Sequence, residues 1–348
     1  MIKKNSPDFC FAKNILLQVS RTFALNINVL SGLLHQSVLL AYLFLRIADT
    51  IEDDPDLAAT EKEKLLKYFA SIFETPEVDP KRVDLFLSML PSQWIQSKDP
   101  NHLLTCRTPV VIGLWSELPL GNRKIIQKVI IEMCQGMAKF ALKQEQQLAQ
   151  GWFTIKKTSE LDQYCYYVAG IVGKMLSQLF FIDSRFIDVE TFDDLKKWDV
   201  SFGLALQVTN IIKDVREDAS RKVCFIPEEI CWRHGLKNSY DIFEPDVSPD
   251  VRSAIMKELV DKAWSHLDDS IRYVLKIPRV DRRIRLFCLW PLFMAAENLS
   301  LIGDGKIIFD SEEKAKISRS TVKKIIKDTS LHFYSNRWIE KEYSRLRP

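Results

Sequence analysis

The sequence predicts an all-α protein, and three features of its 348 residues point that way. Apolar residues recur at helical spacing along most of the chain, and no stretch alternates between apolar and polar residues as a half-buried strand does. Glycine and proline are scarce, at 11 and 14 residues, whereas sheet-rich folds need many tight turns. Hydrophobic residues make up 47% of the chain, which is enough for one large core.

The first clear helical pattern runs from Leu33 to Asp53 and stops before Pro55, whose ring disfavours helix at the preceding residue. The other expected helices have the same period and are separated by turn-forming residues. They cover residues 58–74, 79–97, 122–149, 160–183, 192–219, 250–275, 281–302 and 318–345. The turn-rich residues 235–249 could mark a domain boundary, but a surface loop is the better interpretation. We therefore expect a single domain over residues 1–348.

Composition excludes several classes of protein. A net charge of +3 is too small to indicate a nucleic-acid partner. The five histidines are scattered without the spacing of a zinc site, and no glycine-rich phosphate loop is present. Seven cysteines without a C-x-x-C pair indicate free thiols in a reducing cytoplasm.

No segment reads as a targeting or membrane-spanning element. Residues 1–11 lack the apolar core of a secretory signal. The longest apolar stretch, residues 37–48, is too short to cross a bilayer. We expect a cytoplasmic protein that at most contacts the membrane surface.

The first of two acidic clusters closes the helix expected over 33–53. Asp49, Glu52 and Asp53 are related by i, i+3 and i+4, so three carboxylates share one face. They lie at the C-terminal end of an apolar helix, where backbone carbonyls already carry partial negative charge. A solvated helix end with Arg46 as local partner is one interpretation, and a bound cation is the other.

The second cluster is a polar stripe on a later helix, made of Gln207, Asn210, Asp214, Glu217 and Asp218. Its acids again gather near the helix end, with Lys213 and Arg216 as local partners. Two clusters of the same form favour a hard divalent cation, because Mg²⁺ takes carboxylate oxygens and leaves room for substrate phosphate.

Four blocks of the sequence resemble the squalene/phytoene synthase family, and the resemblance covers about residues 15–325. The blocks are Ser20-Arg21-Thr22-Phe23, Asp49-x-x-Glu52-Asp53, Tyr164 to Gly170, and Asp214-x-x-x-Asp218. Residues 205–214, 287–296 and 315–319 look most like the squalene synthase branch, of the bacterial type. The resemblance implies an isoprenoid-synthase-type helical bundle around a central pocket, with the two acidic clusters facing each other across its mouth.

The resemblance also implies roles for individual residues. The Mg²⁺ ligands would be Asp49, Glu52, Asp53, Asp214, Glu217 and Asp218. The substrate diphosphates would be contacted by Ser20, Arg21, Arg46, Gln207, Asn210 and Lys213. Tyr164 would act with the four aspartates in catalysis, although from its own sequence context it reads as a core tyrosine. Lys316 and Arg319 would hold the phosphates of NADPH, or else be solvated charges at a helix start.

The implied activity is head-to-head condensation of two farnesyl diphosphates, or similar allylic diphosphates, through presqualene diphosphate to squalene. Mg²⁺ and NADPH would be the cofactors, and the protein would be a monomer. The alternatives are non-reductive coupling to dehydrosqualene, hydroxysqualene or phytoene, and a non-catalytic member acting as an assembly or binding protein. A basic amphipathic helix expected over 318–348 suggests peripheral membrane contact.

The chain departs from the family pattern at two points. Lys213 stands where the family usually has arginine, which keeps the charge but loses bidentate geometry. Residues 218–223 lack a glycine that many relatives carry, so no phosphate role is assigned to Arg221. No dinucleotide-binding glycine fingerprint is present, so the use of NADPH rests on the resemblance alone.

Overall fold

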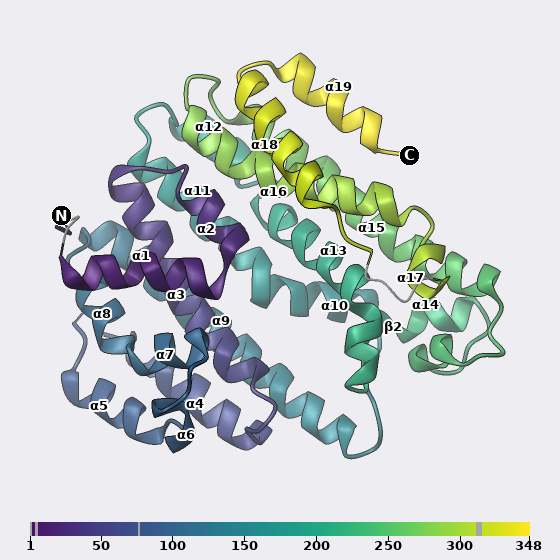
Figure 1. Cartoon of the computed structure of the whole chain (residues 1–348), viewed down its shortest axis with the longest axis horizontal. Coiled ribbons are helices and arrows are strands. Elements are labelled where there is room, and N and C mark those ends of the chain that lie inside the picture. Colours follow the sequence, from purple (N-terminus) through teal and green to yellow (C-terminus); the bar gives the residue numbers. More distant parts are fainter. Residues whose placement is uncertain (1, 4–5, 76, 311–314) are drawn as a thin grey trace. The chain divides into compact units, whose positions relative to one another are not determined.

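The computed structural model describes residues 2–3, 6–75, 77–310 and 315–348, and these form helices joined by short connections (Figure 1). The all-α prediction is confirmed. The chain divides into two compact units, which are described separately below. The first comprises Met1–Leu142 and Met175–Arg185, and the second comprises Lys143–Lys174 and Phe186–Pro348. A single domain over the whole chain stays a prediction.

The first unit is built around one buried helix. Its elements are α1 (Pro7–Val19), α2 (Arg21–Ile27), α3 (Gly32–Asp53), α4 (Ala59–Ser71), α5 (Pro80–Met89), α6 (Ser92–Ile95), α7 (Pro100–Cys106), α8 (Thr108–Ser116), most of α9 (Leu120–Leu148) and the C-terminal part of α11 (Ile171–Asp183). Helix α3 packs against α1, α4, α7 and α8. Its Phe44 meets Phe73 and Trp115 edge to face, with ring centroids 5.0 and 6.4 Å away. The acids at the end of α3 are therefore carried by a rigid core helix.

Several short helices of this unit were not predicted, because their starts look like turns in the sequence. Asp99-Pro100 lies between the helices expected over 79–97 and 122–149, yet Asp99 caps α7 by accepting a hydrogen bond from the Asn101 amide at 2.7 Å. Proline fits the first position of a helix, where no intrahelical N–H bond is needed. The helix expected over 79–97 is wrong as one element, since it breaks into α5 and α6 at Leu90-Pro91.

The second unit contains several long helices and two short strands. Its elements are β1 (Phe153–Ile155), α10 (Thr158–Cys165), a π-helical turn (Tyr166–Gly170), the start of α11, α12 (Val189–Leu195), α13 (Asp199–Ser220), β2 (Val223–Pro227), α14 (Glu228–Arg233), a 3₁₀ turn (Ser239–Phe243), α15 (Pro249–Lys276), α16 (Arg282–Ile302), α17 (Lys306–Asp310), α18 (Arg319–His332) and α19 (Asn336–Leu346). Strands β1 and β2 pair in parallel, with Phe153 opposite Val223. Neither strand was expected, because three and five mostly buried residues are too few to show alternation.

Helix α13 approaches the π-helical turn and α11 at backbone contact distance. A Cβ atom added to Gly173 would lie 1.8 Å from the carbonyl oxygen of Asp199. One added to Gly203 would lie 2.2 Å from the carbonyl oxygen of Ala169. Only glycine permits this approach, so these two glycines fix the place of the helix that carries the second acidic cluster.

The C-terminal segment forms two helices, not the one expected over 318–348. The break falls at residues 333–335, where Ser335 caps α19. Arg285 of α16 holds this break from within the core, with no exposed surface of its own. It donates to the carbonyl oxygens of Phe333 at 2.7 Å and Ile277 at 2.6 Å, and to Oδ1 of Asn336 at 2.7 Å. Burial lowers the pKa of Arg285 to about 10.

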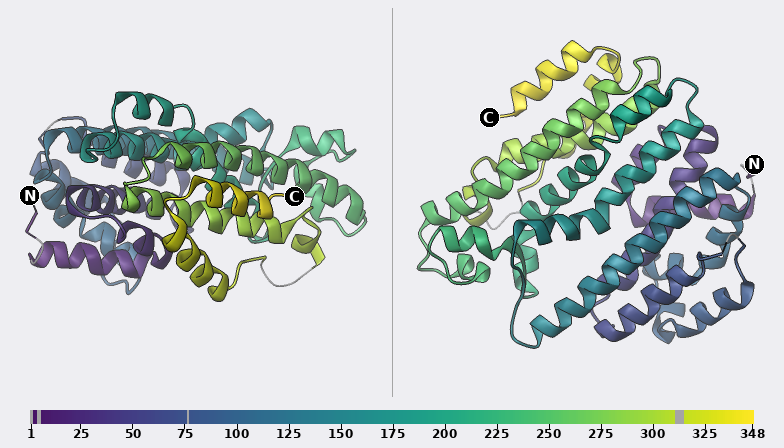
Figure 2. Two further views of the ribbon diagram at one scale, coloured as in Figure 1. Left: turned by 90° about the horizontal axis from the view of Figure 1, so that it is seen from above. Right: turned by 180° about the vertical axis from the view of Figure 1, so that it is seen from behind.

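Helices α18 and α19 pack along α15 and α16 (Figure 2). Ile339 and Tyr343 are buried, and the Tyr343 hydroxyl donates to Asp268 at 2.8 Å. Trp290 Nε1 of α16 donates to Thr329 Oγ1 at 3.1 Å. Apolar residues of the segment that suggested a membrane-binding helix thus pack against the rest of the second unit, and membrane contact through this segment stays a prediction.

In the part of the chain that the structure describes, two helical stretches are long and apolar enough to cross a bilayer by length and composition alone. They are Thr158–Asp183 and Arg282–Ile302, and 78% of the most apolar window of the second is buried. That degree of burial is typical of a core helix, which passes the same test of length and composition.

Replacing Arg285 with alanine should destabilise the protein by about 3–5 kcal/mol. The substitution leaves one buried carbonyl, one part-buried carbonyl and a part-buried amide oxygen without their donor. Each unsatisfied buried group costs about 1–3 kcal/mol. Urea denaturation measures the change, with exposed Arg279→Ala as the control. Equal midpoints for the two variants would show that the buried hydrogen bonds do not hold the C-terminal segment.

Candidate functional site

The first acidic cluster lies on the last turns of α3, in the first unit. The Asp49 side chain is 35% exposed and lies 3.8 Å from Nη1 of Arg46. Its pKa is raised to about 7, chiefly because the surrounding protein displaces most of its water, and then by the charge of Asp53. Burial and the charges of Asp53 and Asp49 raise the pKa of Glu52 well above its ordinary value. The three predicted ligands are therefore close together, and with all three ionised their negative charge would exceed what their surroundings balance.

Neighbouring groups hold this cluster in place. Arg46 Nε donates to Asn101 Oδ1 at 2.9 Å, and Lys62 Nζ donates to the Glu52 carbonyl oxygen at 2.7 Å. A cation bound to a terminal carbonyl stabilises a helix end. Asp54, which was not assigned a role, is buried and accepts from the amides of two following residues. Asp54 thus caps the end of the helix, and Asp49, Glu52 and Asp53 are not needed for that cap.

Tyr42 is a site residue that the sequence analysis missed. Burial raises the pKa of Tyr42, against the opposing effects of a hydrogen bond with Ser20 and the charge of Arg46. The charge of Asp49 adds to the rise. Ser20 caps α2 by accepting from the Phe23 amide at 3.2 Å, whereas Arg21 is exposed. The structure therefore brings the Ser20 block to the first acidic cluster. Residues 42, 46, 49 and 53 follow helical spacing, which was the available signal.

The second acidic cluster lies on the last turns of α13, in the second unit. Burial raises the pKa of Asp218 to about 6 against the opposing effect of Arg221, and the charges of Asp214 and Glu217 add to the rise. Arg221 Nη2 donates to Asp218 Oδ1 at 2.6 Å. Upstream on the same helix are Gln207, Asn210 and Lys213, and Lys213 Nζ donates to Asn210 Oδ1 at 3.1 Å. The predicted polar stripe is present.

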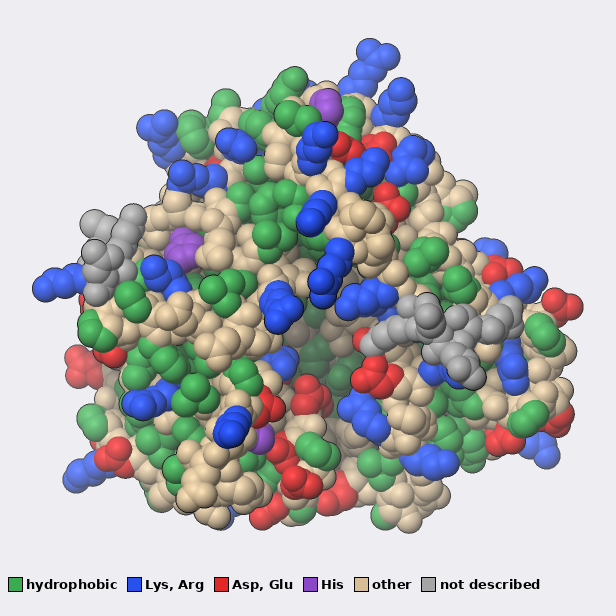
Figure 3. Space-filling model, in the orientation of Figure 1, with side chains coloured by type: hydrophobic (Ala, Val, Ile, Leu, Met, Phe, Trp, Pro, Cys, Tyr) green, Lys and Arg blue, Asp and Glu red, His purple; other side chains and the backbone are tan. Residues whose placement is uncertain are grey.

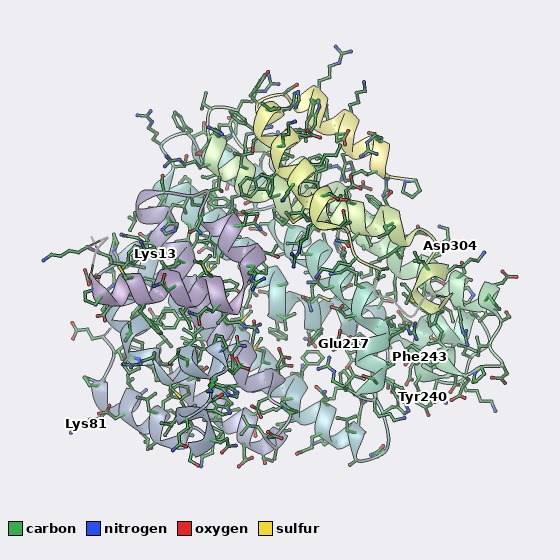
Figure 4. All side chains as sticks on the ribbon, in the orientation of Figure 1. Lys13, Lys81, Glu217, Tyr240, Phe243 and Asp304 are labelled. Carbon is green, nitrogen blue, oxygen red and sulfur yellow. The ribbon has the colours of Figure 1, made fainter. Side chains whose placement is uncertain are left out.

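The missing family glycine has a structural explanation. Lys222 has a φ of 60°, a left-handed conformation that favours glycine. Its ammonium lies 4.9 Å from the centre of the Trp152 ring, a cation–π contact that offsets part of the backbone cost. Trp152 in turn stacks on Tyr240, which lies beside Phe243 in Figure 4. The turn from α13 into β2 is thus kept without glycine.

Tyr164 is half-buried, and its ring stacks on Phe225 of β2 with centroids 4.7 Å apart. The strand that the sequence analysis missed therefore supports the tyrosine that it singled out. The next turn, Tyr166–Gly170, is π-helical, a form that is rare and often found at functional sites. Lys174 Nζ donates to the Tyr166 hydroxyl at 3.3 Å across this turn.

Lys316 and Arg319 are both exposed at the start of α18. Ser318 caps the helix by accepting from the Thr321 amide at 3.1 Å, and the Ile317 amide donates to Asn298 Oδ1 at 3.1 Å. The preceding residues 311–314 lie outside the described ranges. Contact of Lys316 and Arg319 with NADPH stays a prediction.

Both clusters fit Mg²⁺ by their chemistry. Each supplies hard carboxylate oxygens, and raised carboxyl pKa values in each show negative charge that a cation would neutralise. Within residues 2–3, 6–75, 77–310 and 315–348, no group of three or more histidine, cysteine or acidic residues is arranged to hold a metal ion by itself. Mg²⁺ is commonly bound through one or two carboxylates and substrate phosphates, so an open cluster suits it. That the two clusters face each other stays a prediction.

A surface hollow of about 510 Å³ on α9 contains none of the predicted site residues. It is lined by Lys124, Gln127, Lys128, Ile131, Glu132 and Gln135. The central pocket implied by the family resemblance is a different feature and stays a prediction.

The raised pKa of Asp49 predicts a pH-dependent stability without Mg²⁺. Because the folded-state pKa is about 7 and the unfolded value is about 3.9, the folded form holds the extra proton between these values. This contribution to stability is full near pH 4 and is lost as pH rises to about 7. Asp49→Asn should therefore raise the melting temperature at pH 8 in EDTA but not at pH 4. A lower melting temperature at pH 8 would mean that Asp49 forms a stabilising ion pair with Arg46.

Comparison with known proteins gives the same family as the four sequence blocks. The squalene/phytoene synthase family matches residues 16–321. Squalene synthase of Rattus norvegicus is 30% identical over 312 residues, covering 90% of this chain and 67% of the rat protein. Squalene synthase 1 of Arabidopsis thaliana is 29% identical over 327 residues, covering 93% of this chain and 72% of the plant protein. The chain thus spans about two thirds of the length of these relatives.

Solved structures of related enzymes are also similar to this chain. TcSQS in complex with the ligand E5700 superposes with a TM-score of 0.79 at 26% identity, covering 98% of this chain and 91% of TcSQS. A dehydrosqualene synthase in complex with a ligand gives a TM-score of 0.64 at 22% identity, covering 94% of this chain and 97% of that one, which shows the shared fold. The isoprenoid-synthase-type fold is confirmed, while the bacterial branch stays a prediction. The chain belongs to the squalene/phytoene synthase family of head-to-head prenyltransferases.

Proposed function

We propose that the protein condenses two molecules of farnesyl diphosphate head to head, through presqualene diphosphate, and reduces this intermediate to squalene with NADPH. The observation that carries the proposal is the pair of acidic helix ends with raised carboxyl pKa values, in a chain about 30% identical to squalene synthases. The six predicted acids would hold Mg²⁺, which when bound neutralises the leaving diphosphate.

Cationic side chains beside the acids bind the diphosphates in this proposal. Arg46 is already oriented by Asn101 and Asp49, so its guanidinium is available at low entropic cost. Arg21 is exposed and adds a second planar donor from the start of α2. Lys213 lies among the acids of the second cluster and acts as a point charge.

Tyr164 is the proposed proton-handling and orienting group. When C1 of one farnesyl chain closes a cyclopropane ring with the double bond of the other, one diphosphate leaves and one proton is lost. The Tyr164 hydroxyl would help accept or direct that proton while Phe225 fixes the ring plane. Apolar residues must exclude water, because water would capture the cation as an alcohol. Residues 287–296 of α16 are almost all buried and suit this role.

Non-reductive coupling to dehydrosqualene, hydroxysqualene or phytoene is the second candidate. It is favoured by the lack of a dinucleotide-binding glycine fingerprint in the sequence. A non-catalytic role as an assembly or binding protein is disfavoured, because all six predicted metal ligands are acidic in this chain.

Incubation of the full chain with labelled farnesyl diphosphate and Mg²⁺, with and without NADPH, tests the proposal. We expect squalene with NADPH, and presqualene diphosphate with minor alcohol or dehydrosqualene without it. The same product under both conditions would replace the proposal with the non-reductive one.

The double substitution Lys316→Ala/Arg319→Ala should weaken the response to NADPH while sparing presqualene diphosphate formation. Lys316 lies on the connection into α18 and Arg319 is the first residue of that helix, and neither belongs to the acidic clusters. Product ratios over an NADPH titration measure the effect. Lys323→Ala/Lys327→Ala, two exposed lysines farther along α18, is the matched control. An unchanged NADPH requirement would leave Lys316 and Arg319 as solvated charges.

A further inference from the structure

One end of the second unit exposes an apolar tip. The turn between α15 and α16 and the turn between α18 and α19 lie side by side there, because Arg285 donates to a carbonyl oxygen in each. Val280 lies on the first turn and is 67% exposed. Tyr334 lies on the second and is 56% exposed, and Leu331, one turn earlier, is 58% exposed. Large apolar side chains that cluster at the tips of turns are unfavourable on a surface that contacts only water.

Arginines surround this tip. Residues 278–283 and 331–337 contain four arginines and a single acid, Asp281. The arginines are Arg279, Arg282, Arg283 and Arg337, and all four are exposed. Asp281 caps α16 by accepting from the Ile284 amide. In Figure 3, blue and green side chains, with some red ones among them, lie at the upper edge, where α18 and α19 lie in Figure 1.

We propose that this end surface, made of Val280, Leu331, Tyr334 and the four arginines, binds an anionic lipid membrane. Aliphatic and aromatic tips enter the interfacial layer, and arginines beside them pair with lipid phosphate and carboxylate groups. Arg282 lies 5.6 Å from the centre of the Phe333 ring, so its charge stays next to the apolar tip. The surface differs from the apolar face of α18 and α19, which packs against α15 and α16 of the same unit.

Charge argues for lipid over a second copy of the chain. A twofold contact through this surface would place four arginines against the same four arginines with only Asp281 on each side to balance them. An anionic membrane supplies the opposite charge over a broad plane. The proposal does not depend on the coupling chemistry, so the two can fail separately.

Sedimentation with phosphatidylcholine vesicles, with and without phosphatidylserine, tests the proposal on the full chain. We expect binding only with phosphatidylserine, weakened by salt. Each arginine near the surface contributes about five-fold in partitioning, so Arg279→Gln/Arg283→Gln should weaken binding about 25-fold. Val280→Ser/Tyr334→Ser should also weaken it. Leu301→Ser is the matched control, because Leu301 is 46% exposed at the other end of α16.

Three outcomes would overturn the proposal. The first is equal binding, or none, with the two kinds of vesicle. The second is a control variant that loses binding as strongly as the surface variants. The third is a wild-type dimer in light scattering that Val280→Ser/Tyr334→Ser converts to monomer, which would make the surface a self-interface. Melting curves confirm that each variant is folded, and turnover of water-soluble farnesyl diphosphate should be unchanged in all of them.

Discussion

Asp53→Asn and Asp214→Asn should each lower kcat/KM for head-to-head coupling by about 10²–10³-fold or more, the loss typical of a group that stabilises transition-state charge. Both residues lie in clusters whose carboxyl groups are held close together at a helix end. Loss of one carboxylate weakens the cation site and so the departure of diphosphate. Stability should be unchanged or higher, because relief of repulsion at a helix end is worth about 0.3–1 kcal/mol.

Asp54→Asn is the matched control for these substitutions. Asp54 is adjacent to Asp53 in sequence, but its Oδ1 accepts from the amides of Asp56 and Leu57 at 2.8 and 3.1 Å. We expect Asp54→Asn to lower the melting temperature, because an amide oxygen accepts these two hydrogen bonds more weakly than a carboxylate does. The folded enzyme should keep its specific activity. If Asp53→Asn instead unfolds the protein and leaves specific activity intact, the cluster is a structural ion-pair network.

Gly173→Ala and Gly203→Ala should be the most destabilising single-methyl additions in the second unit. The new methyl groups would lie 1.8 and 2.2 Å from the carbonyl oxygens of Asp199 and Ala169. Backbone oxygens cannot move aside as a flexible side chain does, so helices must separate. Overpacking typically costs about 1–3 kcal/mol and sometimes more, and we expect the upper end here. Activity should also fall, because separation displaces the helix that carries Asp214.

Gly113→Ala is the control for the glycine substitutions. Nothing lies within 4 Å of a Cβ atom at Gly113, which is in the exposed interior of α8. Alanine there should stabilise the protein by about 0.5–1 kcal/mol through helix propensity alone. Chemical denaturation of the three variants measures the contrast. Similar stabilities for all three would show that α13 does not depend on close backbone contact.

The sequence was sufficient for features that follow helical spacing. The acids of both clusters were expected on one face of a helix end, and the structure has them there. Tyr42 lies on the same face seven residues before Asp49 and could have been found by extending that spacing. Tyr42 was missed because it carries no charge that would distinguish it on an apolar helix.

Other features depend on contacts between distant segments and could not be predicted. Strand β2 forms because β1 lies beside it, and only then does Phe225 support Tyr164. The break between α18 and α19 is held by Arg285, about fifty residues earlier, which local propensity does not reveal. The strained conformation at Lys222 became explicable only through its contact with Trp152.

The most direct test of the account is whether the full chain joins two farnesyl diphosphates in a reaction that needs a divalent cation and both acidic clusters. Labelled farnesyl diphosphate should give a thirty-carbon head-to-head product with Mg²⁺ and none with EDTA, and the folded Asp53→Asn and Asp214→Asn variants should give little. A folded wild-type protein that forms no such product, or forms it equally well in EDTA, would contradict the account.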